Sequence, residues 1–274
     1  MYYSILKFYR KLPLFKGKFR LGHMLFKKLI NKDESISFRA HDNIIYQIPN
    51  TKENIGKELL INGRYESEIV SFLKKIVNDG AVYFDIGANI GTIGLPVIMK
   101  RSNVRYYGFE ASPVVFKYLQ ANFKANCITN YHLYNNLVHS DDNQSMKFYQ
   151  AELYGKSSLA PTYSQDYVFV NSVSLDGFCK AHNIFHVDVI KIDVQGFELN
   201  VFQGMRELLL NRQVAHILFE FEGWAEEQAR LPIAAAQEYL LSLNYELFDL
   251  EGNKIAGILT TGSNMIWAKP ASLK

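Results

Sequence analysis

The chain has 274 residues, 48% of them hydrophobic, and a formal net charge of +3. This length and composition are sufficient for one large α/β core, and the sequence lacks both an apolar run of about 18 residues, as a membrane span needs, and the apolar core of a signal peptide. With only two cysteines, Cys127 and Cys179, a disulfide framework is not expected, and a reducing cytoplasm is the expected compartment.

The charge is unevenly distributed along the chain. Residues 1–30 carry eight basic residues and no acidic residue, whereas the rest has 22 basic and 27 acidic residues, a net of −5. An acidic body argues against a broad surface for nucleic-acid phosphates, so no nucleic-acid partner is expected. Residues 1–30 also contain many aromatic and aliphatic residues, a mixture suited to peripheral contact with the inner face of an anionic membrane. The alternative is a helix pair packed on the domain, with its lysines in solvent.

Hydrophobic periodicity and turn residues predict the elements in chain order. We assign residues 1–60 to a basic and aromatic N-terminal segment, helical and then with short strands, and residues 61–274 to the main domain. The first predicted elements are a strand at 43–49, a helix at 65–78, a buried strand at 81–87, a helix at 90–101 that Pro96 kinks or shortens, a strand at 104–110, a helix at 112–126 and a strand at 130–139. Ser112 is the predicted N-cap of the helix at 112–126, with Pro113 at its first position.

An inserted hairpin or flap is predicted at about 140–173, where two alternating stretches flank a segment rich in Gly, Ser and Pro. The remaining predicted elements are a helix at 174–183, a strand at 187–193, a helix at 198–210, a strand at 214–222, a helix at 233–243 and two closing strands at 245–250 and 264–269. This alternation predicts an α/β fold with a doubly wound, mostly parallel sheet of seven strands and helices on both faces.

One strand ends in an acid that glycines follow, in VYFDIGANIGTIG at residues 82–94. Its spacing, D-x-G-x-N-x-G from Asp85, differs from the G-x-G-x-x-G of dinucleotide phosphate binders. Ligands of doubly wound sheets bind beyond the carboxyl ends of the strands. There Asp85 suits a ligand with an ammonium group, and Glu110, at the end of the next strand, offers two oxygens to the hydroxyls of a ribose. S-adenosylmethionine has a ribose, a positive charge and no phosphate.

Two groups of motifs resemble known methyltransferases. FDIGANIG with GFEASP resembles the opening of class I methyltransferases, which have a Rossmann-like sheet. DVIKIDVQGFELNVFQGM (188–205) and the lead-in from Tyr65 resemble FkbM-type methyltransferases over roughly residues 60–225. The resemblance implies S-adenosylmethionine-dependent O-methylation, often of sugar or polyketide hydroxyls. Gln195 departs from the pattern, because the family usually has Glu there, and an amide is no useful base.

The resemblance also implies which residues hold the cofactor. Glu110 would hold the ribose, and Glu66 would close over the methionine end unless it is only an acid at a helix start. Asn136 would continue the adenine wall unless it is an ordinary turn amide. The residues that would shape the rest of the cofactor pocket are Asp85, Gly87, Ala88, Asn89 and Gly91, with Ala111 and Ser112 beside the adenine.

Three residues at the ends of two later strands are candidates for the reaction. Asp193 is the predicted base for the acceptor hydroxyl, and Lys191, on the same face of its strand, would pair with it or orient the acceptor. The alternative is a purely structural Lys–Asp pair. Glu220 would bind the acceptor, a metal or nothing. No metal site is predicted, because the histidines lack the spacing of zinc ligands.

The sequence thus predicts an S-adenosylmethionine-dependent O-methyltransferase that acts on a hydroxyl of a saccharide or glycosylated precursor. The saccharide rests on the resemblance alone. Two alternatives stay open, namely a methyltransferase for RNA or protein, and a non-catalytic member that binds cofactor or a partner. Gln195 keeps the last of these open.

Overall fold

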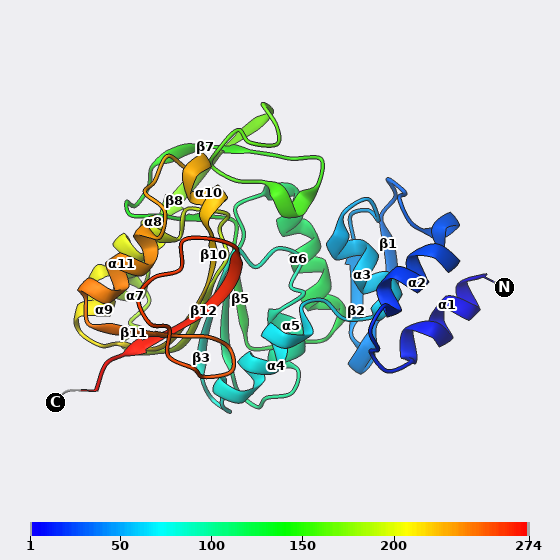
Figure 1. The fold of residues 1–274 in the computed structure, drawn as a ribbon, viewed down its shortest axis with the longest axis horizontal. Helices are drawn as coiled ribbons and strands as arrows, with labels where there is room; N and C mark the ends of the chain where they lie inside the picture. The colour runs from blue at the N-terminus through cyan, green and yellow to red at the C-terminus, as the bar shows by residue number, and fades with distance from the viewer. Residues whose placement is uncertain (1, 273–274) are drawn as a thin grey trace.

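The computed structural model describes residues 2–272, and a seven-stranded sheet forms its centre (Figure 1). In spatial order its strands are β11 (Tyr245–Phe248), β12 (Ser263–Pro270), β10 (Val214–Glu222), β9 (Val187–Ile192), β3 (Val82–Ile86), β4 (Arg105–Phe109) and β5 (Tyr131–Tyr134). Only β12 runs antiparallel to its neighbours; the other pairs are parallel. The predicted doubly wound, mostly parallel sheet is confirmed.

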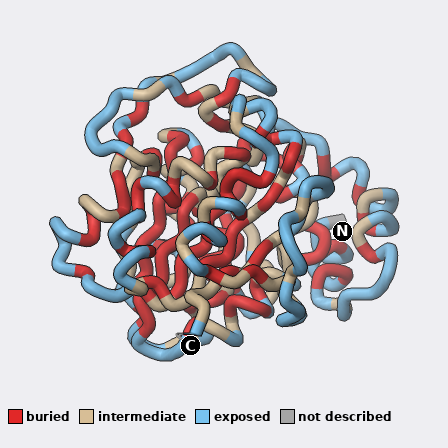
Figure 2. The backbone as a smooth tube through the Cα atoms, turned by 60° about the vertical axis from the view of Figure 1, so that its left-hand side comes forward, coloured by how far each residue is buried: buried red, intermediate tan, exposed pale blue. Residues whose placement is uncertain are grey.

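Helices cover both faces of this sheet, because its central strands are buried on both sides. Phe84 of β3 packs in one hydrophobic cluster with α7, α8, α9 and α11, whereas its neighbour Tyr83 packs in a second cluster with α4, α5 and α6. The helices are α4 (Ser67–Ile76), α5 (Gly94–Ile98), α6 (Pro113–Ala125), α7 (Leu175–Ala181), α8 (Glu198–Gln203), α9 (Arg206–Leu210), α10 (Gly223–Gln228) and α11 (Ala235–Ser242). In Figure 2 the buried strands lie inside a shell of exposed loops and helix faces.

The structure corrects three predicted elements. The predicted strand at 130–139 is divided: β5 ends at Tyr134, and β6 (Leu137–Val138) joins a separate three-stranded sheet with β8 (Tyr167–Val173) and β7 (Ser145–Tyr149). The predicted helix at 198–210 is broken at Gly204, where an added Cβ would overlap the carbonyl oxygen of His139. The predicted helix at 90–101 begins only at Gly94, because Pro96 requires a place in the first turn.

Residues 2–62 form a smaller unit at one end of the molecule, blue in Figure 1. It consists of α1 (Tyr2–Lys11), α2 (Lys18–Leu25), α3 (Asn54–Asn62) and the antiparallel pair β1 (Ile36–Arg39) and β2 (Ile45–Ile48), with short 3-10 turns η1 (Lys27–Leu29) and η2 (His41–Asn43). The sequence patterns did not predict α3 or α10. Within residues 2–272 no helix is both long enough and apolar enough to cross a bilayer.

Asn122 of α6 and Asn126, which caps the C-terminus of α6, join this unit to the main sheet domain. The side chain of Asn122 accepts from the Gln47 N–H at 2.6 Å and donates to its carbonyl at 3.1 Å. Asn126 does the same for Ile45, at 2.8 and 2.7 Å. The free edge of β2 is therefore paired with side chains rather than with another strand, which satisfies its backbone polar groups.

Candidate functional site

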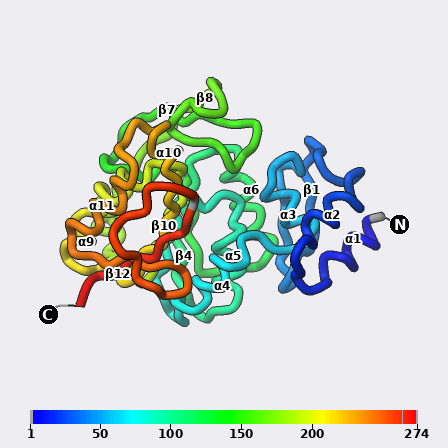
Figure 3. Tube along the Cα trace, in the orientation of Figure 1, coloured from blue at the N-terminus to red at the C-terminus, as the bar shows by residue number. Residues whose placement is uncertain are grey.

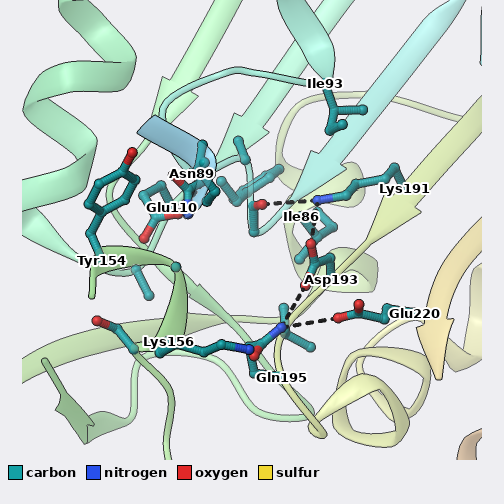
Figure 4. A pocket seen from close by; sticks show the side chains of 18 of the residues that line it. Ile86, Asn89, Ile93, Glu110, Tyr154, Lys156, Lys191, Asp193, Gln195 and Glu220 are labelled. Carbon is teal, nitrogen blue, oxygen red and sulfur yellow. Dashed lines mark hydrogen bonds and ion pairs between the residues drawn. The ribbon is translucent and has the colours of Figure 1, made fainter. Parts of the chain in front are cut away.

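A cavity of about 340 Å³ opens at the carboxyl ends of β3, β4 and β9 (Figure 4). The flap closes the cavity on one side with η3 (Tyr154–Lys156). Glu53, the N-cap residue of α3, also lines the cavity. This volume is ordinary for a small-molecule site. Of the residues that the sequence singled out, the cavity is lined by Glu66, Gly87, Ala88, Asn89, Glu110, Ala111, Asn136, Lys191, Asp193 and Glu220.

The turn after β3 brings the backbone against the end of β9. Gly87 has a φ of 72°, and an added Cβ would overlap the carbonyl oxygen of Asp193. The N–H groups of Gly87 and Ala88 both donate to the Phe109 carbonyl, at 3.0 and 2.9 Å. These contacts tie the turn to both neighbouring strands, so position 87 requires a residue without a side chain.

Glu110 faces the cavity from the end of β4. It is 7% exposed, and its two oxygens accept the N–H groups of Ser112 and Asn89 at 2.8 and 2.9 Å. Burial nonetheless raises the pKa of Glu110 to about 7, although these hydrogen bonds and Lys191 oppose the rise. Asn135 fixes the backbone here by donating to the carbonyls of Glu110 and Ala111. Each carboxylate oxygen keeps a lone pair for a hydroxyl donor in the cavity.

Asp85 lies beneath the cavity, not on its wall. It is fully buried; its Oδ2 accepts the Tyr106 hydroxyl at 2.8 Å, and its Oδ1 lies 3.4 Å from Nζ of Lys191. The same Nζ donates to the Gly87 carbonyl at 3.0 Å and lies 3.5 Å from Oδ2 of Asp193. Burial lowers the pKa of Lys191, but Asp193 and Asp85 outweigh this and raise it well above its usual value. Asp85 therefore meets the cavity through Lys191, which replaces the direct ligand contact expected from the sequence.

Asp193, Gln195 and Glu220 form a connected group on the opposite wall from Glu110 (Figure 4). The Gln195 amide donates to Oδ1 of Asp193 at 3.2 Å and to Oε2 of Glu220 at 3.0 Å. Burial raises the pKa of Asp193, but Lys191 and hydrogen bonds from Glu220 and Gln195 hold it below its usual range. Burial, reinforced by the charges of Asp193 and Glu222, raises the pKa of Glu220 to about 11. Glu220 thus holds its proton more strongly than an ordinary glutamate does.

Two more of the singled-out residues lie behind the wall. Gly91 packs against Phe123 and Leu119 of α6. Ser112 caps α6, where its hydroxyl accepts the Val115 N–H at 3.3 Å, and it meets the site only through its N–H on Glu110. Both shape the site from outside the cavity.

The sequence did not single out several residues of the cavity wall, most of them outside the main motifs. Tyr154 and Lys156 belong to the flap, and Glu53 caps α3 while its Oε2 accepts the Gly155 N–H at 3.4 Å. Thr92 and Ile93 follow the glycine turn. Nothing in the residue pattern of Glu53 marks it as a site residue, because its place depends on how the N-terminal unit meets the flap.

The site fits S-adenosylmethionine on its own chemistry. Glu110 has free lone pairs for the two hydroxyls of a ribose. The backbone at Gly87 leaves room for close approach of a ligand. Asp193 and Glu66 also line the cavity, and carboxylates suit the positively charged sulfonium and ammonium groups of that ligand.

The chain matches the model of the methyltransferase FkbM domain over residues 85–247, which are 163 of its 274 residues. No curated protein matches it in sequence. Solved structures with a similar arrangement include a precorrin-6y C5,15-methyltransferase from Geobacter metallireducens GS-15, with 13% identity, 75% of this chain and 87% of that chain covered and a TM-score of 0.44.

An rRNA methylase from Streptococcus thermophilus has 10% identity, 74% and 94% coverage and a TM-score of 0.42. TrmK from M. capricolum, solved with S-adenosyl-homocysteine, has 9% identity, 73% and 65% coverage and a TM-score of 0.41. The family match covers more than half of the chain and includes Asp85, Glu110, Lys191, Asp193 and Glu220. The chain belongs to the FkbM methyltransferase domain family, and it is a methyltransferase whose cofactor is S-adenosylmethionine.

Proposed function

We propose that the protein methylates a hydroxyl group of a saccharide or glycosylated precursor. The observation that carries this proposal is the carboxylate of Asp193 in the cavity wall. Lys191 keeps it ionised, and Gln195 orients it beside the protonated Glu220. An ionised carboxylate in the cavity wall is what an alcohol acceptor requires, because an alcohol must lose its proton as it is methylated.

In this proposal, Glu110 accepts the ribose hydroxyls of the cofactor, and the Gly87–Asn89 turn and Glu66 surround its methionine end. When bound, S-adenosylmethionine supplies an electrophilic methyl group. Ala111 and Asn136 line the cavity on the adenine side, with Leu137 and Val138 of β6 beside them. The protein mainly positions the acceptor, since correct placement supplies much of the rate for a displacement at carbon.

Asp193 takes the proton of the acceptor hydroxyl. The pKa of Asp193 is low because of the Lys191 ammonium. A weak base nevertheless suffices, because the O–H proton of the alcohol becomes strongly acidic as the oxygen bonds to the methyl carbon. The Gln195 amide donates to both Asp193 and Glu220, and the pKa of Glu220 is raised to about 11, so Glu220 keeps its own proton and does not compete for that of the acceptor. In this arrangement Gln195 has a positioning role, and the amide at this position leaves the base intact.

The charge of the acceptor side favours a saccharide over RNA. Asp193 and Glu222 line the cavity, so a phosphate backbone entering there would meet carboxylates. Next to Gln195 a small hollow is lined by Tyr163 and Trp224. Their ring centroids lie 6.0 Å apart in an edge-to-face arrangement. Neutral hydroxyl groups and an apolar ring face suit this surface.

Glu110→Gln should weaken binding of S-adenosylhomocysteine roughly 10- to 100-fold, the loss expected for charge-assisted hydrogen bonds. Wild-type affinity should also fall as pH drops below about 7, because the pKa of Glu110 is raised to about 7 and its protonated form accepts hydroxyl donors poorly. Calorimetry across pH measures both effects. Glu66 also has a pKa of about 7, so Glu110→Gln should remove only its own part of the pH dependence, and Glu66→Gln/Glu110→Gln should remove both parts. The full wild-type pH dependence in Glu110→Gln would contradict the assignment.

Asp193→Asn should leave affinity for S-adenosylhomocysteine within about twofold and lower turnover by roughly 10²- to 10⁴-fold, the contribution of a positioned base. Labelled S-adenosylmethionine with panels of glycans, RNA and proteins measures turnover. The exposed flap residue Asp166 provides the control, since Asp166→Asn should change neither quantity. Transfer of label to RNA or protein instead of glycans would refute the proposal of a saccharide acceptor. Full activity in Asp193→Asn would show that Asp193 is not the base.

A further inference from the structure

The helices α1 and α2 have an inner face that packs into the N-terminal unit. Leu6 and Tyr9 of α1 and Phe26 after α2 share one hydrophobic cluster with Leu60 and Ile61 of α3. Gly22 brings α2 so close that an added Cβ would overlap Ile61. The inner faces of both helices are thus fully occupied, and their other faces point to solvent at the end of the molecule that carries the N-terminus (Figures 1 and 3).

This solvent-facing side, which we call the outer face, is unusually apolar. Phe8 and Met24 are 69% and 68% exposed. The large apolar side chains of the outer face are Tyr3, Ile5, Phe8, Leu14, Phe15, Leu21, Met24 and Leu25. Such a concentration of exposed aromatic and aliphatic residues within 23 consecutive positions, Tyr3 to Leu25, is characteristic of a binding surface.

The charges of the outer face have one sign. Its exposed cations are Lys7, Lys11, Lys16, Arg20, Lys27 and Lys28, and none of them has an ion-pair partner among the described residues. The first acid in the chain is Asp33. The two remaining bases serve the fold instead: Arg10 donates to the carbonyls of Leu60 and Arg39, and Lys18 to those of Leu12 and Arg10.

We propose that the outer face binds an anionic lipid surface. Apolar and aromatic residues interleaved with unpaired lysines on helices that lie flat on the protein match an interfacial anchor, in which the apolar side chains enter the headgroup region and the lysines meet lipid phosphates. A second copy of the chain fits less well, because a two-fold contact would set the same six cations against each other. Because its charges are all positive, the outer face favours an anionic membrane over a second copy of the chain.

Cosedimentation of the full chain with phosphatidylserine-containing vesicles and with pure phosphatidylcholine vesicles tests this proposal. Binding to the anionic vesicles should be at least tenfold stronger. Lys7→Glu/Lys11→Glu should weaken it by roughly tenfold or more, and Phe8→Ser/Met24→Ser should weaken it to a similar degree. Each variant should bind S-adenosylhomocysteine like wild type, which shows that it is folded.

Matched controls lie elsewhere on the surface. Phe185 is 71% exposed, so Phe185→Ser should not affect vesicle binding, and neither should Lys117→Glu/Lys124→Glu on the exposed side of α6. Three results would overturn the proposal: no binding to anionic vesicles, equal loss in the control variants, or Phe8-dependent self-association in sedimentation velocity without vesicle binding. Binding to heparin or RNA with no binding to vesicles would overturn it as well.

Discussion

Lys191→Met should lower the free energy of unfolding by about 3–5 kcal/mol, the cost of removing one partner from a buried ion pair. The Asp85 side chain is 0% exposed and that of Lys191 is 4% exposed. Without the ammonium, Asp85 keeps only the Tyr106 hydroxyl, and the Gly87 carbonyl loses its side-chain donor. Because that carbonyl belongs to the glycine turn, the variant should also lose affinity for the cofactor.

Urea unfolding measures the free energy of unfolding, and two further variants isolate the contribution of the buried ion pair. Asp85→Asn/Lys191→Met removes both charges and should recover part of the lost stability. Lys254 also pairs with a glutamate, Glu246, at 2.7 Å, but on the surface. Lys254→Met should therefore leave the unfolding midpoint nearly unchanged. If Lys191→Met is as stable as wild type, Lys191 is not the counter-charge of a buried carboxylate.

Gly87→Ala should destabilise the protein by roughly 2–5 kcal/mol and abolish cofactor binding. A left-handed backbone costs a residue with a Cβ about 1–2 kcal/mol, and forcing an atom into a packed site adds about 1–3 kcal/mol. Here the added methyl group would overlap the backbone of Asp193, and no side-chain rotation relieves that contact. The turn must move away from β9, which displaces Ala88 and Asn89 in the cavity wall.

Gly80→Ala is the matched control for this substitution. Gly80 has a φ of 76°, close to the 72° of Gly87, but an added Cβ there would meet nothing within 4 Å. This substitution should cost only the left-handed backbone contribution, about 1–2 kcal/mol, and leave calorimetric affinity for S-adenosylhomocysteine intact. Equal effects of the two substitutions on stability and binding would show that the contact with Asp193 is unimportant.

The sheet and the main motifs were predictable because they depend on local sequence. Buried apolar runs ending in polar residues define β3, β4, β9 and β10, and the carboxyl ends of parallel strands meet at one edge. Glu110, Lys191, Asp193 and Glu220 therefore lie around one cavity, as the spacing predicted. The capping pattern at Ser112 and Pro113 predicted the start of α6 correctly, since a cap depends only on adjacent residues.

Other features depend on distant contacts and were missed for that reason. The stretch 130–139 has the composition of one strand, but the Asn135 side chain bonds back to β4, and β6 then pairs with the flap. The position of Asp85 at a strand tip predicted contact with the ligand. Its alternation along β3 instead directs it to Tyr106 and Lys191, and only the fold shows that Lys191 lies between it and the cavity.

Titration calorimetry of the purified chain with S-adenosylhomocysteine tests the central claim most directly, namely that the cavity between Glu110 and Asp193 is the cofactor site. The predicted result is saturable heat for a single site per chain, with weaker affinity in Glu110→Gln and none in Gly87→Ala. Absence of binding heat from the folded wild-type chain, or affinity unchanged in both variants, would contradict the account.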